Sequence, residues 1–114
     1  CFDKQISTGP SPAISGVMDY IEEHLDQALN MTELAPRAGL SLPRFKSRFR
    51  QETGVPPREY VLRRKIHAAK KKLLNSEKSI THIALDLGFS SSQYFATVFR
   101  RFTSMTPGKF RKRA

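Results

Sequence analysis

Apolar residues recur every three or four positions along most of the chain, which is the spacing of the inward face of a helix. The pattern starts at Pro12 and returns in the ranges 42–52, 57–74 and 91–102. The apolar face of the first helix consists of Ile14, Val17, Met18, Ile21 and Leu25. No stretch alternates apolar and polar residues with a period of two, so we expect an all-α fold.

Capping residues and glycines divide the chain into about seven helices. Helix starts are predicted at Asn30 (with Glu33), Ser41, Ser79 and Ser90 (with Gln93), the first and last pairs forming capping boxes. Helix ends are predicted at Gly39, Gly54 and Gly88. Pro36 lies inside a predicted helix, where it removes a backbone hydrogen bond and should bend the turn. Residues 1–12 are polar and contain breakers, so they are predicted to be a linker or tail.

An internal repeat organises the rest of the chain. LAPRAGLS at 34–41 aligns with IALDLGFS at 83–90, an offset of 49. After one inserted residue the offset becomes 50 and pairs Phe45 with Phe95, Phe49 with Phe99, Arg50 with Arg100, Thr53 with Thr103, Pro57 with Pro107, and Tyr60 with Phe110. Each copy is a short helix, a glycine-containing turn and a second helix, which is the helix-turn-helix plan.

The repeat predicts two helix-turn-helix units, at 13–55 and 76–114, joined by a connecting helix at 56–75. Tetratricopeptide pairs of helices share the order of elements. Their repeat, however, is about 34 residues long, and they would not place one long basic helix between two copies.

Charge is distributed unevenly along the chain. The 20 basic and 10 acidic residues give a formal net charge of +10. Residues 1–40 carry 2 basic and 6 acidic side chains, a net −4, whereas residues 41–114 carry 18 basic and 4 acidic side chains, a net +14. This asymmetry favours a polyanionic partner, nucleic acid first and an anionic membrane second. The alternative is a basic surface that serves only solubility.

The sequence contains few residues that could carry out catalysis or bind a metal ion. Cys1 is the single cysteine, and His24, His67 and His82 fall on three different predicted helices. We find no metal-binding spacing, glycine-rich phosphate loop or catalytic motif, so we expect no catalytic residue, metal or cofactor. No apolar run approaches the length of a membrane span. A nonspecific architectural or RNA-binding protein remains the main alternative, and a basic amphipathic helix at 57–74 lying on a membrane is a weaker one.

Two segments resemble the DNA-binding domain of the AraC/XylS family of regulators. The first is GL-S-x-x-x-F-x-x-x-F-(R/K)-x-x-x-G-x-x-P-x-x-Y at 39–60. The second, more diagnostic segment is SI-x-x-IA-x-x-x-GF-x-x-x-x-YF-x-x-x-F-(R/K)-(R/K) at 79–101, followed by Thr106-Pro107. The resemblance covers about residues 13–113. Ser104 departs from it, standing where the family usually has glycine, and Phe110 stands where it usually has tyrosine.

The resemblance implies a seven-helix domain that binds double-stranded DNA with two recognition helices in successive major grooves. It also implies a cytoplasmic bacterial transcription regulator, more often an activator than a repressor, with RNA polymerase as a further candidate partner. In this family an effector or dimerisation domain usually precedes the DNA-binding domain. The first residue is not Met, so we expect this chain to be a piece of such a longer protein.

The outward faces of the two recognition helices supply the predicted DNA contacts. Predicted base contacts are Pro43, Lys46 and Ser47 on the first helix, and Ser92, Gln93, Ala96 and Thr97 on the second. Predicted phosphate contacts are Arg44, Arg50, Arg100, Arg111 and the helix N-termini at Asn30 and Ser79. Gln93 has a competing role in its capping box. On the connecting helix, Arg63, Arg64 and Lys65 either flank the DNA or face solvent, and solvent is favoured for at least two of them.

Overall fold

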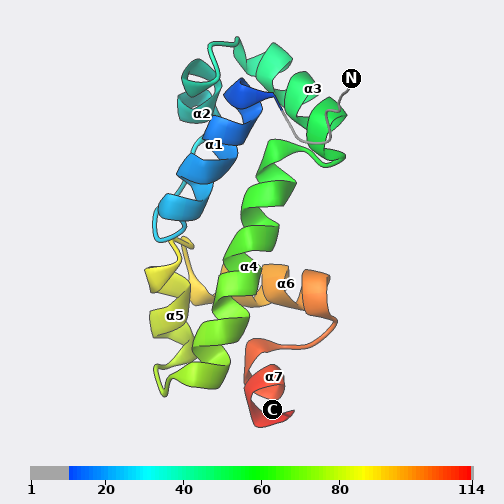
Figure 1. Cartoon of the computed structure of the whole chain (residues 1–114). Helices are drawn as coiled ribbons and strands as arrows, with labels where there is room; N and C mark the ends of the chain where they lie inside the picture. The colour runs from blue at the N-terminus through cyan, green and yellow to red at the C-terminus, as the bar shows by residue number, and fades with distance from the viewer. Residues whose placement is uncertain (1–10, 114) are drawn as a thin grey trace.

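The computed structural model describes residues 11–113, and every regular element in that range is a helix (Figure 1). The helices are α1 (Pro12–Glu23), α2 (Met31–Arg37), α3 (Leu42–Thr53), α4 (Pro57–Asn75), α5 (Ile80–Asp86), α6 (Ser92–Thr103) and α7 (Pro107–Arg113). The prediction of an all-α chain with seven helices is therefore confirmed for the described residues. Of the predicted tail, Ser11 is the N-cap of α1 and Pro12 its first residue, while residues 1–10 lie outside the described range.

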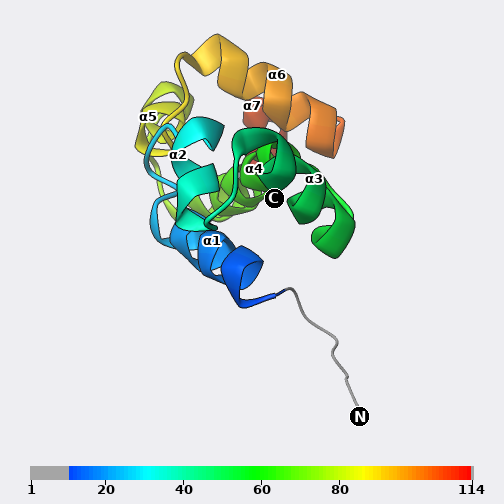
Figure 2. The same ribbon diagram turned by 90° about the horizontal axis from the view of Figure 1, so that it is seen from above.

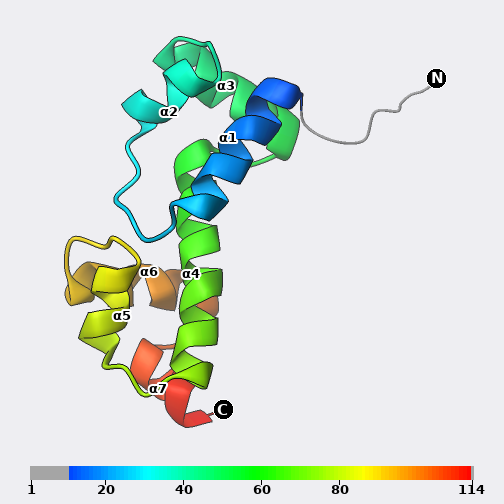
Figure 3. The same ribbon diagram turned by 60° about the vertical axis from the view of Figure 1, so that its left-hand side comes forward.

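Two separate hydrophobic cores lie along α4. The first joins α1, α2 and α3 through residues such as Ile21, Leu34 and Phe45, and receives Val61 from α4. The second joins α5 and α6 through residues such as Ile83 and Phe95, and receives Leu62, Ile66, Ala69 and Leu73 from α4. The first unit consequently lies at the N-terminal end of α4 and the second packs along the middle and C-terminal part of α4, in a molecule 48 × 29 × 21 Å across (Figures 1 and 3).

The internal repeat extends to individual hydrogen bonds. The Thr53 hydroxyl donates to the carbonyl of Phe49 at 2.8 Å, and the Thr103 hydroxyl donates to the carbonyl of Phe99 at the same distance. Each of these helices then ends in a left-handed residue, Gly54 after α3 and Ser104 after α6. The paired sequence positions at offset 50 thus carry the same local structure.

Ser104 is the described non-glycine residue with a positive φ, at 63°. A side chain in this conformation brings its Cβ close to the following carbonyl oxygen, which costs about 1–2 kcal/mol. Ser104, which departs from the family pattern, therefore adopts the left-handed conformation that glycine adopts at less cost.

The predicted N-cap of α6 differs from the observed one. Ser91, not Ser90, is the N-cap, and its hydroxyl accepts a hydrogen bond from the Tyr94 amide at 3.0 Å. The predicted capping box of Ser90 with Gln93 was therefore wrong. The inserted residue of the second repeat lies in the turn before the helix, so the caps Ser41 and Ser91 correspond at the same offset of 50 as the helices themselves.

The acidic helix α1 and the recognition helix α6 lie on opposite sides of α4 (Figure 2). The α1 N-terminus is tied to the end of α3, because the Ser11 amide and hydroxyl both donate to the Glu52 carboxylate, at 2.6 and 3.1 Å. These bonds, led by the one from the amide, lower the pKa of Glu52. The arrangement keeps the acidic surface of α1 away from the face of α6.

Candidate nucleic-acid interface

The first recognition helix, α3, divides sharply into a buried and an exposed face. Phe45 and Phe49 are fully buried in the first core. All five residues predicted to contact DNA on this helix are exposed: Pro43, Arg44, Lys46, Ser47 and Arg50. The division follows from helical periodicity, because residues one position away from a buried residue point about 100° from it. The exposed face carries three cations and no acid among these five positions.

The second recognition helix, α6, presents a smaller and less charged face. Gln93, Thr97 and Arg100 are exposed, whereas Ser92 and Ala96 are half-buried. The Thr97 hydroxyl donates to the Gln93 carbonyl at 3.0 Å, which occupies its donor within the helix. Ser91 caps α6, so the Gln93 side chain does not have the capping role that was predicted from the sequence.

Two predicted phosphate contacts at helix N-termini are N-caps as expected. The Asn30 side chain accepts from the amide and the hydroxyl of Thr32, at 2.9 and 2.8 Å. Ser79 accepts from the His82 amide at 3.0 Å. Both side chains thus satisfy the first turn of a helix, and their contact with phosphate stays a prediction.

Arg111 has backbone partners that the sequence did not indicate. Its guanidinium donates to the carbonyl of Leu73 at 3.0 Å and to that of Ser76 at 3.1 Å, at the C-terminal end of α4. A cation at this position satisfies carbonyls that have no partner within the helix. The guanidinium therefore has an internal structural role that competes with the predicted phosphate contact.

The three basic residues of the middle of α4 have different environments. Arg64 pairs with Glu22 of α1 at 2.5 Å, and the Arg63 guanidinium lies 6.0 Å from the centre of the Phe102 ring. Lys65 is only 4% exposed. Both sequence alternatives for Lys65, DNA flank and solvated face, were therefore wrong, because its side chain turns between the two units.

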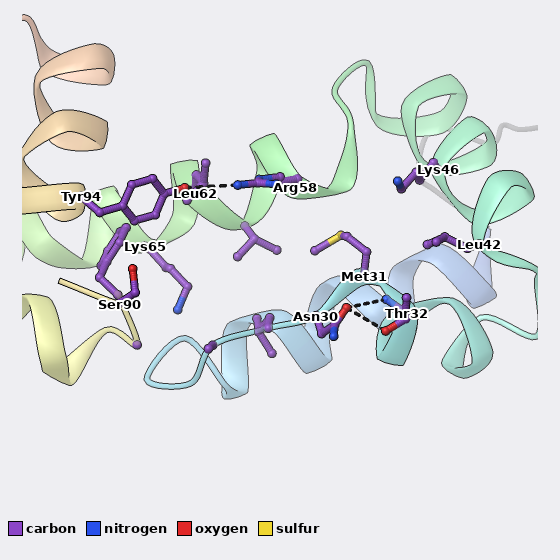
Figure 4. A pocket seen from close by; sticks show the side chains of 15 residues that line it. Asn30, Met31, Thr32, Leu42, Lys46, Arg58, Leu62, Lys65, Ser90 and Tyr94 are labelled. Carbon is purple, nitrogen blue, oxygen red and sulfur yellow. Dashed lines mark hydrogen bonds between the residues drawn. The ribbon is translucent and has the colours of Figure 1, made fainter.

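A cleft of about 590 Å³ lies between the two units. Lys46 of α3 stands at one end and Tyr94 of α6 at the other, with Arg58 of α4 between them (Figure 4). The N-terminus of α2, from Asn30 to Thr32, forms another wall. The structure thus brings together Lys46 and Asn30 from the predicted set, whereas Ser79 and Arg111 are not among the lining residues.

Arg58 is a candidate DNA contact that sequence reasoning missed. It is exposed in the cleft, and its guanidinium approaches the Tyr94 hydroxyl at 3.4 Å. The sequence signal that could have found Arg58 is its position in the first turn of α4. The helix dipole disfavours a positive charge there, so a cation at that position is not explained by the helix itself.

Within residues 11–113, no group of three or more His, Cys, Asp or Glu side chains is arranged to hold a metal ion. None of the helices in the same part of the chain is both long and apolar enough to cross a bilayer.

Comparison with known proteins identifies the family. A family model described as a helix-turn-helix domain matches residues 34–113, which is more than half of the chain. Among curated proteins, the transcriptional activator RhaS of Pectobacterium carotovorum is 32% identical over 114 residues, covering all of this chain and 41% of RhaS. The regulatory protein SoxS of Salmonella typhimurium is 37% identical over 100 residues, covering 88% of this chain and 94% of SoxS. The chain therefore spans less than half of RhaS but nearly all of SoxS.

Solved structures agree with this assignment. The DNA-binding domain of the global transcriptional factor AdpA, in complex with a target DNA, superposes with a TM-score of 0.86 at 29% identity, covering 90% of this chain and 93% of that one. An AraC-type regulator from Chromobacterium violaceum gives a TM-score of 0.81 at 27% identity, covering 90% and 91%. Helix-turn-helix domains of such transcription regulators bind DNA and are not enzymes. The chain belongs to the AraC family of bacterial transcription regulators and is a DNA-binding domain of that family.

Proposed function

We propose that this domain binds a specific duplex sequence by placing α3 and α6 in successive major grooves on one face of the DNA. The observation that carries the proposal is the repeated unit: two recognition helices with buried aromatic faces and exposed polar faces, each packed through its own core against α4. Entry into successive major grooves requires the two recognition helices to lie about 34 Å apart, which is one turn of duplex.

The two helices contribute differently to this binding. Lys46 and Ser47 carry most of the base recognition on α3, with Pro43 against a thymine methyl, since Lys favours guanine acceptors and Ser is promiscuous. On α6, Gln93 recognises adenine, while Ser92, Ala96 and Thr97 add small contacts. Arg44, Arg50 and Arg100, together with the N-termini at Asn30 and Ser79, hold phosphates. Arg58 joins them in the cleft, and Arg111 serves mainly to close the end of α4.

The wider role follows from the relatives. RhaS is named as an activator, and we propose that the protein containing this domain activates transcription in the bacterial cytoplasm, with RNA polymerase as its partner. Because the chain spans 41% of RhaS, we further propose that an effector or dimerisation domain belongs to the whole protein.

Selection from a random duplex pool, at about 0.15 M salt where purely electrostatic binding is weakened, tests the proposal. We expect an asymmetric motif of two short boxes about one helical turn apart. Enrichment of a single box would mean that only one unit recognises bases. Measurable binding without any enrichment would overturn sequence-specific recognition and favour the nonspecific alternative.

A further inference from the structure

Lys65 stands out because it is the buried charged residue of the described chain, with 4% of its surface exposed. Lys65 belongs to the middle of α4, between Leu62 and Ile66 of the second core in the sequence. An ammonium in such a place is costly unless its donors are satisfied. The partners of Lys65 therefore indicate why it is buried.

The Lys65 ammonium donates to three backbone carbonyls that come from both units. Leu25 and Gln27, each with its carbonyl oxygen at 2.7 Å, belong to the segment that joins α1 to α2 in the first unit. The third acceptor is the carbonyl of Leu87, in the turn between α5 and α6 of the second unit. Lysine has three donors, so one side chain uses its full capacity to link two segments about sixty positions apart.

A close backbone contact lies beside this ammonium. Gly88, which follows Leu87, has a φ of 72° and packs so tightly that a Cβ on it would lie 2.6 Å from the Gln27 oxygen and 2.8 Å from the Ala28 nitrogen. The ring of Phe89 is 5.8 Å from the ammonium. We call this set, Leu25, Gln27, Ala28, Lys65 and Leu87–Phe89, the inter-unit junction.

The junction is the polar, buried link between units whose cores are otherwise separate. Elsewhere α6 meets the first turn of α4 through exposed pairs, Arg58 with Tyr94 and Arg101 with Glu59. Exposed pairs contribute little rigidity because water competes for them. The turn that holds the Leu87 carbonyl leads directly into α6, so the hydrogen bond from Lys65 links the first unit to the segment before that recognition helix.

We propose that Lys65 is a positioning residue that fixes the orientation of the second recognition helix relative to the first, and so determines the spacing of the two DNA boxes that the domain accepts. This inference rests on the proposed function, because it requires that both units recognise bases. Lys65 itself does not contact DNA in this proposal.

The test measures binding of wild type and Lys65→Met to the selected two-box duplex and to duplexes with one base pair added or removed between the boxes. For wild type, we expect each spacing change to weaken binding by about tenfold, comparable with a mismatched base pair. For Lys65→Met, the loss should fall to about threefold or less, while affinity for a single box stays at the wild-type level. Lys71→Met removes the same charge from an exposed position of the same helix and should keep the wild-type spacing profile.

The outcomes separate the two proposals. If wild type recognises no second box, the proposed function fails. If wild type is strict in spacing and folded Lys65→Met is equally strict, the role of Lys65 is overturned. Should circular dichroism show Lys65→Met to be unfolded, Gly88→Ala disturbs the same junction while keeping Lys65, and the same flattened spacing profile is expected.

Residual dipolar couplings of the free domain give a second readout that does not depend on DNA. In wild type, couplings from residues 31–53 and 80–103 should fit one alignment tensor, as expected for a rigid pair of units. In Lys65→Met or Gly88→Ala, each unit should keep its internal fit but require its own tensor. Separate tensors in wild type, or one shared tensor in the folded variants, would contradict the proposal.

Discussion

Gly88 lies directly against the backbone of Gln27, leaving no space for a side chain: a Cβ at Gly88 would sit 2.6 Å from the Gln27 oxygen. Its counterpart in the first repeat, Gly39, has nearly the same φ, 70° against 72°, but no atom within 4 Å of the corresponding Cβ position. The same residue type in the same local conformation thus has a packing role in one unit that it lacks in the other.

These two glycines form a matched pair of variants. Gly39→Ala should lower the free energy of unfolding by about 1 kcal/mol, because alanine is strained in a left-handed conformation. Gly88→Ala carries the same strain plus a backbone clash, and should cost about 1–3 kcal/mol more. Urea unfolding of both variants measures the difference. Equal losses would mean that the segment joining α1 and α2 moves freely away from Gly88.

Ser104→Gly should stabilise the domain. Ser104 has a φ of 63°, and glycine removes the penalty of a side chain there, so the free energy of unfolding should rise by about 1 kcal/mol. The gain is reduced by the greater freedom of glycine in the unfolded chain. Thermal unfolding checks the sign, with Gly54→Ser at the equivalent position of the first unit as the reverse control, expected to destabilise. No change in the melting temperature of Ser104→Gly would show that the turn carries no strain.

Arg111→Ala should reduce stability more than it reduces DNA affinity. The variant leaves the carbonyls of Leu73 and Ser76 without their donor, at a cost of about 1–3 kcal/mol. Lys112→Ala, at an exposed neighbouring position, is the control with the same change of charge. Unfolding and binding are measured for both. A decrease in the salt dependence of binding specific to Arg111→Ala, without a loss of stability, would instead support a phosphate contact.

Substitutions of base-contacting and of phosphate-contacting residues on the recognition helices should have different effects on DNA binding. Lys46→Ala and Gln93→Ala should each relax specificity at one base pair, by about 1–3 kcal/mol. Arg50→Ala should weaken binding to all sequences alike and lower the dependence of affinity on salt. Titrations with the selected duplex and with random duplex at two salt concentrations distinguish the cases. Equal losses on both duplexes would remove Lys46 or Gln93 from base recognition.

Lys65 should titrate well below the ordinary pKa of a lysine side chain. Burial lowers the pKa of Lys65 from 10.5 to about 8, and the charge of Asp26 opposes this only in part. Between pH 8 and 10.5 the folded chain has lost a proton that the unfolded chain still holds, so the contribution of Lys65 to the free energy of unfolding rises with pH in this window. NMR titration of the lysine ε-carbons gives the pKa, and unfolding of wild type relative to Lys65→Met gives the linkage. A Lys65 signal that titrates near 10.5 would contradict the prediction.

The sequence predicted the helices and their buried faces well because both depend on local pattern. Phe45 and Phe49, like Phe95 and Phe99, recur at a helical spacing, and all four are fully buried. The start of α6 was misplaced by one residue, since three consecutive serines, Ser90 to Ser92, are equally suitable caps by type. The structure places the cap at Ser91, whose hydroxyl accepts from the Tyr94 amide.

The amino-acid sequence by itself determined the class of this protein: a repeated helix-turn-helix domain with a basic second part, and hence a DNA-binding module. The tertiary structure alone decided the roles of Lys65 and Arg111, whose backbone acceptors lie 22 to 40 positions away along the chain. Helical periodicity reports which face of a helix turns inward, whereas a long cationic side chain is able to bury its stem and still reach a polar partner. Which carbonyls stand within that reach depends on how separate helices pack, and no local pattern encodes that packing.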